Sequence, residues 1–503
     1  MYLFSEEMIS NCYLLTFFLV LNLNSIHSYV VLPINILPKE NYKSDYEANS
    51  PKDIMLKEFI TSFYTEYEIG TEPQKIPMII KQKINDYVVT SANPMTNPKR
   101  DYSEKVIYSL SENFLQKYKF FNESESSTVS LGTCKNRKPY DDDIEKPLAE
   151  QMCASTDTVL LYENVDLKEK VSEKEFHFDL VRNIEDNVPG IIGLALTDEY
   201  HQTSFLSVLK QKKLIENYNW FFDCEKWNST SGKVVIGALP HEVYPDKYSI
   251  EDFYNDTIES SNNYFWEINF DSIFVKDKIF SSETAGLDLE SNLNIGSKEY
   301  KKYLESSIEE LVTNEKCFKD SFKGYDEDND FSTNYDFYYC KKDDDVKKQL
   351  STFLTTISFQ SKSSNFTFEL TNEQLMKEDG DYIFINVVFS NHEDRWKLGK
   401  QIALKYTFVF NPQNKTVSFY KKSSKGGEGD KDKDQEPEGK TDGNSEDGEG
   451  GSSALVIILI IVLCIVVIAI VIFVVIFCKK KKENSSELKD SQYYDGKDSQ
   501  IVP

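Results

Sequence analysis

"FYTEYEIGTEPQKIPMII", residues 63–80, indicates the fold class, and the six residues after it, KQKIND at 81–86, bear on function. The β-branched and aromatic residues on both sides of Gly70 and Pro73 predict a strand, a tight turn and a second strand. The next residues, YVVTSA, again favour a strand. Binding and catalytic residues often lie in loops held by such strands, so the lysines of KQKIND decide whether the chain is an enzyme.

Short runs rich in β-branched and aromatic residues alternate with turn residues from Tyr29 to about Tyr420. Clear examples are KVVIGALP, FLTTISFQ, YIFINVVF and TVSFY. Helical spacing of apolar residues is found mainly at 204–215 and 297–312. We therefore expect a mostly β pair of domains, which a chain of 503 residues with 40% apolar content is long enough to build.

The chain is strongly acidic, with a formal net charge of −26. A nucleic-acid partner is not expected, because phosphate binding requires a basic face. Part of the acidity lies in residues 421–453, which contain no apolar residue that could anchor a core. That composition predicts an acidic, disordered stalk.

Two apolar segments predict the location of the chain. Residues 11–28 form a short apolar run that ends in small and polar residues, which predicts a signal peptide over 1–28; a buried N-terminal strand is the alternative. Residues 454–477 carry no charge and are followed by the lysines 479–482. This pattern predicts a transmembrane helix over 454–478 and a cytoplasmic tail over 479–503. We expect a type I membrane protein of the secretory pathway or cell surface.

Five cysteines lie on the predicted lumenal side, where oxidation favours two disulfides and one remaining thiol. Local spacing predicts Cys134 with Cys153 and Cys317 with Cys340, leaving Cys224. Each disulfide would close a loop of about 20 residues, worth about 3 kcal/mol. The same side carries five N-x-S/T acceptor sites for glycosylation, at Asn122, Asn228, Asn255, Asn365 and Asn414.

Several segments resemble the pepsin family of aspartic proteases, in the order in which that family has them. IGTEPQKIPMII fits the family's IGTPPQ hairpin without a gap, and VPGIIGLAL at 188–196 resembles DGILGLG. YFWEINFDSIFV at 264–275 resembles YWQITLDSI, and residues 396–420 resemble the terminal WILGDVFLRQYYTVFD segment. The resemblance implies a bilobal pepsin-like fold, with lobes at 29–250 and 251–420, plus the transmembrane helix.

Catalysis in this family needs one aspartate from each lobe, and the two carboxyl groups share a proton and hold a water molecule. Each aspartate lies in an Asp-Thr/Ser-Gly turn whose hydroxyl braces the opposite loop. The resemblance places other residues in these turns: Lys81, Gln82 and Lys83 in the first, and Asp288, Leu289 and Glu290 in the second.

The substitutions predict a broken catalytic pair. The Lys81 ammonium is expected to point toward Asp288 and hold it ionised, while the other replacements leave both turns unbraced. The family's flap, YGTGS, is replaced by a longer charged loop at 132–159, in which Tyr140 is a candidate for the flap tyrosine.

Two functions follow from the resemblance. The favoured one is a catalytically inactive protein that binds a protein or peptide through its cleft or loops. The alternative is an active membrane-anchored aspartic endopeptidase with a non-standard pair of acids, for instance Asp86 with Asp288. Neither a metal nor a cofactor is expected, because the histidines have no ligand spacing and the acidic run 326–330 has Phe331 and Phe337 where a calcium loop needs glycine and glutamate.

Overall fold

The computed structural model describes residues 28–37, 46–59, 62–82, 87–92, 120–136, 149–184, 189–195, 204–224, 231–257, 266–280, 283–326, 331–392 and 394–421. The predicted signal peptide up to residue 27, the stalk, the span at 454–478 and the tail lie outside these residues. Within them, no helix is both long and apolar enough to cross a membrane.

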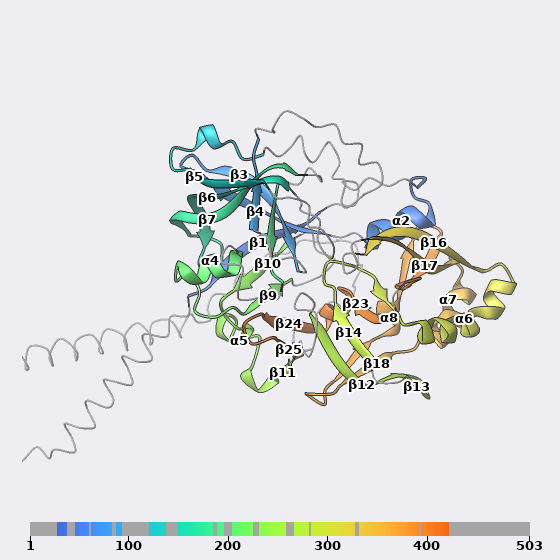
Figure 1. The fold of residues 1–503 in the computed structure, drawn as a ribbon. Coiled ribbons are helices and arrows are strands. Elements are labelled where there is room, and N and C mark those ends of the chain that lie inside the picture. The colour runs from blue at the N-terminus through green and yellow to red at the C-terminus, as the bar shows by residue number, and fades with distance from the viewer. Residues whose placement is uncertain are drawn as a thin grey trace, which may run out of the picture. The chain divides into compact units, whose positions relative to one another are not determined.

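The described strands form two large sheets (Figure 1). The first has 13 strands in the order β11-β25-β24-β9-β10-β1-β2-β3-β8-β4-β7-β6-β5. Their bounds are β1 Val30–Ile36, β2 Phe63–Ile69, β3 Gln74–Lys81, β4 Tyr87–Thr90, β5 Ser130–Asn136, β6 Ala149–Tyr162, β7 Lys170–Ile184, β8 Gly190–Gly193, β9 Trp220–Asp223, β10 Ser231–Ile236, β11 Phe253–Thr257, β24 Tyr406–Asn411 and β25 Thr416–Lys421. This sheet crosses the predicted lobe boundary at 250, because β11, β24 and β25 from beyond it belong to the same sheet.

The second sheet has 12 strands, ten of them in the order β19-β18-β12-β14-β23-β15-β22-β17-β21-β20, with β13 beside β12 and β16 beside β17. Their bounds are β12 Glu267–Val275, β13 Lys278–Phe280, β14 Glu283–Leu287, β15 Asn294–Ile295, β16 Cys317–Asp326, β17 Phe331–Lys341, β18 Ile357–Ser361, β19 Thr367–Leu370, β20 Met376–Asp379, β21 Tyr382–Ile385, β22 Val387–Ser390 and β23 Trp396–Leu398. The mostly β fold class is confirmed.

Helices are few, as the sequence predicts. The described ones are α2 Pro51–Phe59, α4 Phe205–Gln211, α5 Pro240–Val243, α6 Lys298–Thr313, α7 Asp344–Phe353 and α8 Asn372–Leu375, with 3-10 turns η2 Glu123–Glu125, η3 Ile250–Asp252 and η4 Ile402–Leu404. Both predicted helices are present, as α4 and α6. Each begins after a serine, Ser204 or Ser297, whose side chain accepts a hydrogen bond from an amide of the first turn.

The stretch quoted first is a hairpin of β2 and β3. The strands pair without a shift from Phe63 opposite Ile80 to Ile69 opposite Gln74. Gly70 follows β2 with φ of +102°, a conformation that glycine adopts at little cost. The hairpin delivers Lys81, its last residue, to the end of β3.

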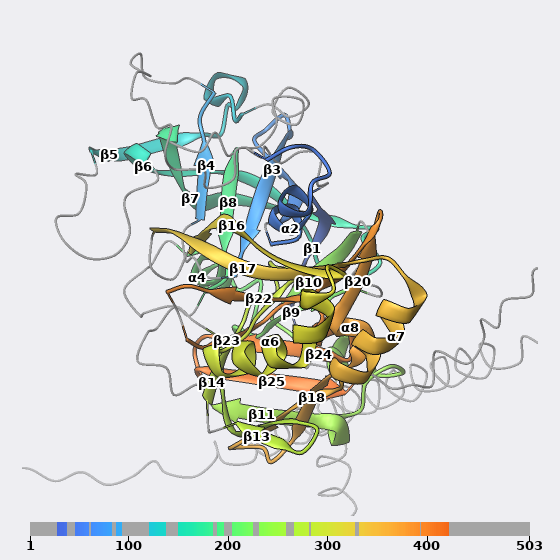
Figure 2. The ribbon, with the colours of Figure 1, turned by 90° about the vertical axis from the view of Figure 1, so that its right-hand side faces the viewer.

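Helix α2 packs on the second sheet, although the strand before it, β1, lies in the first (Figures 1 and 2). Its Phe59 ring lies 4.5 Å from the ring of Tyr335 and 5.5 Å from that of Phe322. Nearby, the Lys323 amide donates to the Tyr46 hydroxyl at 2.7 Å. We call residues 46–59 the N-terminal strap, because this segment connects β1 to the second sheet.

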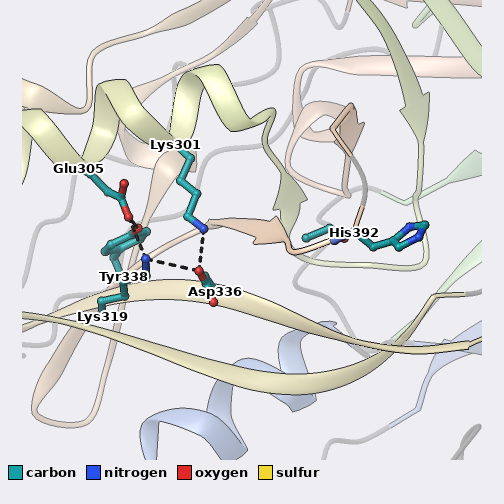
Figure 3. A network of polar contacts seen from close by, with 7 residues as sticks. Lys301, Glu305, Lys319, Asp336, Tyr338 and His392 are labelled. Atoms are coloured by element: carbon teal, nitrogen blue, oxygen red, sulfur yellow. Dashed lines mark hydrogen bonds and ion pairs between the residues drawn. The ribbon is translucent and has the colours of Figure 1, made fainter.

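A network of charges holds α6 against the β16–β17 hairpin (Figure 3). Lys319 lies between two carboxylates, 2.9 Å from Glu305 and 3.4 Å from Asp336, and Lys301 reaches Asp336 at 2.6 Å. Partial burial would raise the pKa of Glu305, but hydrogen bonds from Tyr338 and Lys319 outweigh it and lower that pKa. The opposite charges pair with one another, so the network stabilises the packing of α6 on the β16–β17 hairpin.

Both predicted disulfides are present. Cys134 bonds to Cys153 and Cys317 to Cys340, with Cα separations of 4.0 and 3.9 Å. Each pair lies directly across an antiparallel ladder, β5–β6 or β16–β17. Cys224 belongs to neither disulfide, as predicted, and it is buried.

Removing the second disulfide should destabilise the second sheet. The double substitution Cys317→Ala and Cys340→Ala opens a loop with a sequence separation of 23 residues, and we expect it to lower the free energy of unfolding by about 3 kcal/mol. Urea unfolding followed by tryptophan fluorescence measures the change. The control is the unreduced wild-type chain, and a loss below about 1 kcal/mol would show that the ladder alone fixes the hairpin.

Candidate functional site

Two strand ends that are built alike form the candidate site. In the first sheet β3 ends at Lys81 beside the parallel strand β8, and the Lys81 carbonyl accepts from the Leu194 amide at 2.8 Å. In the second sheet β14 ends just before Asp288 beside the parallel strand β23, and the Asp288 amide donates to the Leu398 carbonyl at 2.8 Å. Each turn therefore leaves its sheet from an equivalent position.

The Lys81 side chain crosses to the second turn. Its Nζ lies 3.0 Å from Oε2 of Glu290, and the two residues are only 4% and 5% exposed. The sequence predicted Asp288 as the counter-ion and counted Glu290 only as the loss of a glycine. The structure shows that Glu290 is a partner of Lys81, whereas a contact of Lys81 with Asp288 stays a prediction.

Two further hydrogen bonds join the turns in opposite directions. The Gln82 amide donates to Oε1 of Glu290, and the Leu289 amide donates to Oε1 of Gln82 at 3.0 Å. The prediction that these replacements leave the turns unbraced is therefore wrong. Glutamine and glutamate side chains are long enough to reach across, so their oxygens supply the acceptors that shorter hydroxyls would supply in the family's turns.

The first turn is also anchored to aromatic side chains of the core. The Gln82 carbonyl accepts from Nε1 of Trp266 at 3.2 Å, and Gln82 is fully buried. The Trp266 ring lies 5.8 Å from that of Trp220 and 4.9 Å from that of Phe410. These aromatic contacts and the backbone bond limit the movement of Gln82.

Asp288 has a different role from Glu290. It is half-buried, and its Oδ1 accepts from the Glu290 amide at 3.2 Å. A carboxylate that accepts from the amide two residues later stabilises a turn. Asp288 therefore shapes the turn that presents Glu290 to Lys81.

The chemistry available to the described pair is limited. Lysine has three donors and no acceptor, so it cannot take a proton from water as a carboxylate does. A carboxylate beside an ammonium stays ionised rather than sharing a proton with a second acid. The contact between Lys81 and Glu290 can hold two loops together, but it does not supply the general acid and base of an aspartic protease.

The N-terminal strap contacts the second turn directly. Asn292 lies two residues beyond Glu290. Its backbone N–H donates to the Glu58 carbonyl at 3.1 Å, and its side-chain Nδ2 donates to Oε2 of Glu58 at 2.7 Å. The Glu58 carboxylate also pairs with Lys377 of β20. Sequence reasoning missed Glu58, because nothing in its local pattern points to a residue 234 positions later.

The flap region is an antiparallel pair, β5 and β6, tied by the first disulfide. Leu131 is 44% exposed and precedes Gly132 and Thr133, as the tyrosine precedes Gly-Thr in the family's YGTGS. That dipeptide was the signal that could have identified Leu131, which the sequence analysis missed. Tyr140, the candidate named for that position, lies outside the described residues.

The alternative catalytic pair is not tested by the structure. Asp86 and Lys83 belong to residues 83–86, which lie outside the described ranges. The possible use of Asp86 with Asp288 therefore stays a prediction.

Comparisons with known proteins identify the family. The model of the family described as eukaryotic aspartyl protease matches residues 62–422. No curated protein matches the chain. The matched range includes both strand ends of the candidate site and both disulfides. The chain therefore belongs to the eukaryotic aspartyl protease family.

Proposed function

We propose that this member of the family is catalytically inactive and binds a protein or peptide ligand. The carrying observation is the ion pair of Lys81 and Glu290 at the meeting point of the two turns. Aspartic proteases need two carboxyl groups with one proton between them at this point. An ammonium in place of one carboxyl group removes the base and neutralises its neighbour.

The bonds between the turns support retention of the site's shape. A site that had lost all use would not need Gln82 and Glu290 to supply crossed acceptors between the lobes. A buried ion pair often stabilises a fold no more than an apolar pair of the same size does. We therefore attribute to the Lys81–Glu290 pair the role of fixing the geometry of the two turns. We infer that the chain keeps the two lobes in register for binding.

Its proposed location is the secretory pathway or the cell surface, with type I topology. The two disulfides fit an oxidising compartment. The uncharged segment 454–477 and the lysines after it support one membrane span with the binding lobes on the lumenal side.

The second candidate function is proteolysis by an aspartic mechanism with a non-standard pair of acids. It is favoured by family membership and by Asp288, which the resemblance of the second turn places at one catalytic aspartate. Family membership alone does not establish activity, because one fold serves active and inactive proteins. This function needs a second carboxylate beside Asp288 that is not balanced by Lys81.

Binding can be tested with a library of fluorescein-labelled decapeptides and the full-length chain in detergent. We expect some peptides to bind and to be recovered uncut by mass spectrometry. Leu131→Asp should weaken that binding at least tenfold, since it places a charge at an exposed apolar position of the flap strand. The matched control is Ile279→Asp, also at an exposed apolar residue, which is on β13 of the other sheet. Absence of binding, or equal loss in both variants, would contradict binding through the cleft.

A further inference from the structure

Strand β11 ends the order of the first sheet among the described strands, with β25 as its neighbour (Figures 1 and 2). We propose that N-linked glycans on Asn255, Asn365 and Asn414 surround this edge and shield it from strand addition. The inference rests on the lumenal location proposed above, and it does not depend on what the candidate site binds.

Asn255 lies in the middle of β11 and is exposed. Its Oδ1 accepts from the Ser418 hydroxyl of β25 at 2.7 Å. A glycan is attached through Nδ2, so this bond to Oδ1 can persist after modification. Side chains alternate along a strand, so Asn255 points away from the face that carries Tyr254 and Asp256.

Asn365 lies beside the opposite face of β11. It is exposed, with φ of +54°, in the turn between β18 and β19. This turn is fixed to β11, because its Ser364 hydroxyl donates to Oδ2 of the buried Asp256 at 3.2 Å. The ring of Phe366 also lies 4.8 Å from that of Tyr254. A glycan on Asn365 would therefore stand on the other side of the same strand from Asn255.

Asn414 lies past the end of β11. It is exposed in the turn between β24 and β25, and Thr416 of β25 pairs with Thr257, the last residue of β11. Asn414 lies four positions before Ser418, the residue whose hydroxyl bonds to Asn255. Glycans on the three asparagines would cover both faces of the edge and its end.

Asn122 differs from these three sites. It is half-buried, and its side chain is used within η2, where Nδ2 donates to Glu125 at 2.8 Å and Oδ1 accepts from the Ser124 amide at 3.2 Å. The backbone N–H of Asn122 also donates to Oε1 of Gln74, in the β2–β3 hairpin, at 2.8 Å. Asn122 therefore serves as a comparison site away from β11. Asn228 lies outside the described residues.

The modification is a group transfer with a lipid diphosphate-linked oligosaccharide as co-reactant. The Asn Nδ2 forms a bond to the anomeric carbon of the first N-acetylglucosamine. The bond from that carbon to the diphosphate oxygen breaks, and the lipid diphosphate leaves with the electron pair. Nδ2 loses one proton to the transferase base or to solvent. No electron is gained or lost overall.

Shielding has a physical reason. An edge strand presents backbone groups that can pair with a second chain, and natural proteins block such edges. The described part of β11 carries one acidic residue, Asp256, but it is buried and points into the fold rather than along the edge. Bulky hydrophilic glycans would supply the protection that charged side chains give to other edge strands.

The test uses the full-length chain made in eukaryotic secretory cells and purified in detergent. Peptide mapping after glycosidase treatment should find glycans on all three asparagines, with both disulfides formed. The triple variant Thr257→Ala, Thr367→Ala and Thr416→Ala removes the acceptor sites and keeps each asparagine. We expect at least half of its monomer to be lost to self-association in sedimentation. Ser124→Ala, which removes the Asn122 site, should stay monomeric.

Glycosidase treatment of the folded wild-type chain is a second test, which remains valid if the triple variant fails to fold. It should produce the same self-association without any substitution. An unoccupied site among the three in a chain with both disulfides formed would overturn the proposal. So would a deglycosylated chain that stays as monomeric as the Ser124→Ala control. Neither result depends on peptide binding or hydrolysis.

Discussion

Replacing Glu290 by alanine should lower the free energy of unfolding by about 3 to 5 kcal/mol, the loss typical of breaking a buried ion pair from one side. The substitution takes the carboxylate from Lys81, which is only 4% exposed, and the acceptor from the Gln82 amide. Urea unfolding followed by tryptophan fluorescence is a suitable measurement, since Trp266 bonds to Gln82.

Matched variants separate the charge from the hydrogen bond. Glu290→Gln keeps an acceptor for Gln82 but leaves the Lys81 ammonium without this carboxylate, so it should remain clearly destabilised. Lys81→Met combined with Glu290→Gln removes both charges and keeps the acceptor, and it should recover most of the stability. A loss below about 1 kcal/mol for Glu290→Ala would mean that the pair does not hold the turns together.

Restoring both family turns should create peptide hydrolysis where Lys81→Asp alone does not. The single change places a new carboxylate against Glu290, and two buried carboxylates repel each other. The quintuple variant, with Lys81→Asp, Gln82→Thr, Lys83→Gly, Leu289→Thr and Glu290→Gly, supplies both acids and both hydroxyl groups that brace the turns. General acid–base catalysis typically raises a rate 10²- to 10⁴-fold, so the quintuple variant should hydrolyse peptide at least about 10²-fold faster than the single variant.

A control keeps this comparison specific. Adding Asp288→Asn to the quintuple variant should abolish the gained hydrolysis, because one acid of the restored pair is then lost. The assay is cleavage of a fluorogenic peptide with and without a pepstatin-type inhibitor. Inhibitor-sensitive turnover by Lys81→Asp alone would show that the turn residues matter less than their hydrogen bonds suggest.

Local patterns predicted much of the fold. The β2–β3 hairpin follows from β-branched residues around Gly70, and α6 follows from apolar spacing over 297–312. Both disulfides followed from short sequence separations, which favour local loop closure. These features depend on neighbours in the chain, so a single sequence contains the information for them.

Contacts between distant segments were not predictable in the same way. Glu290 was counted as a damaged glycine position, yet its long side chain reaches Lys81 and Gln82 across 209 and 208 residues. Glu58 of the strap meets Asn292 through a short helix that has no strong sequence pattern. Residue type alone cannot show which buried charge will meet which, because the partner is chosen by the packing of the two lobes.

Cleavage of an unfolded protein by the wild-type chain is the most direct test of the proposed inactive site. The measurement compares hydrolysis at acid and neutral pH, with and without a pepstatin-type inhibitor. With Lys81 and Glu290 paired where two acids are needed, we expect no inhibitor-sensitive cleavage at either pH. Inhibitor-sensitive cleavage by the wild-type chain would contradict the account and favour an active protease with a different pair of acids.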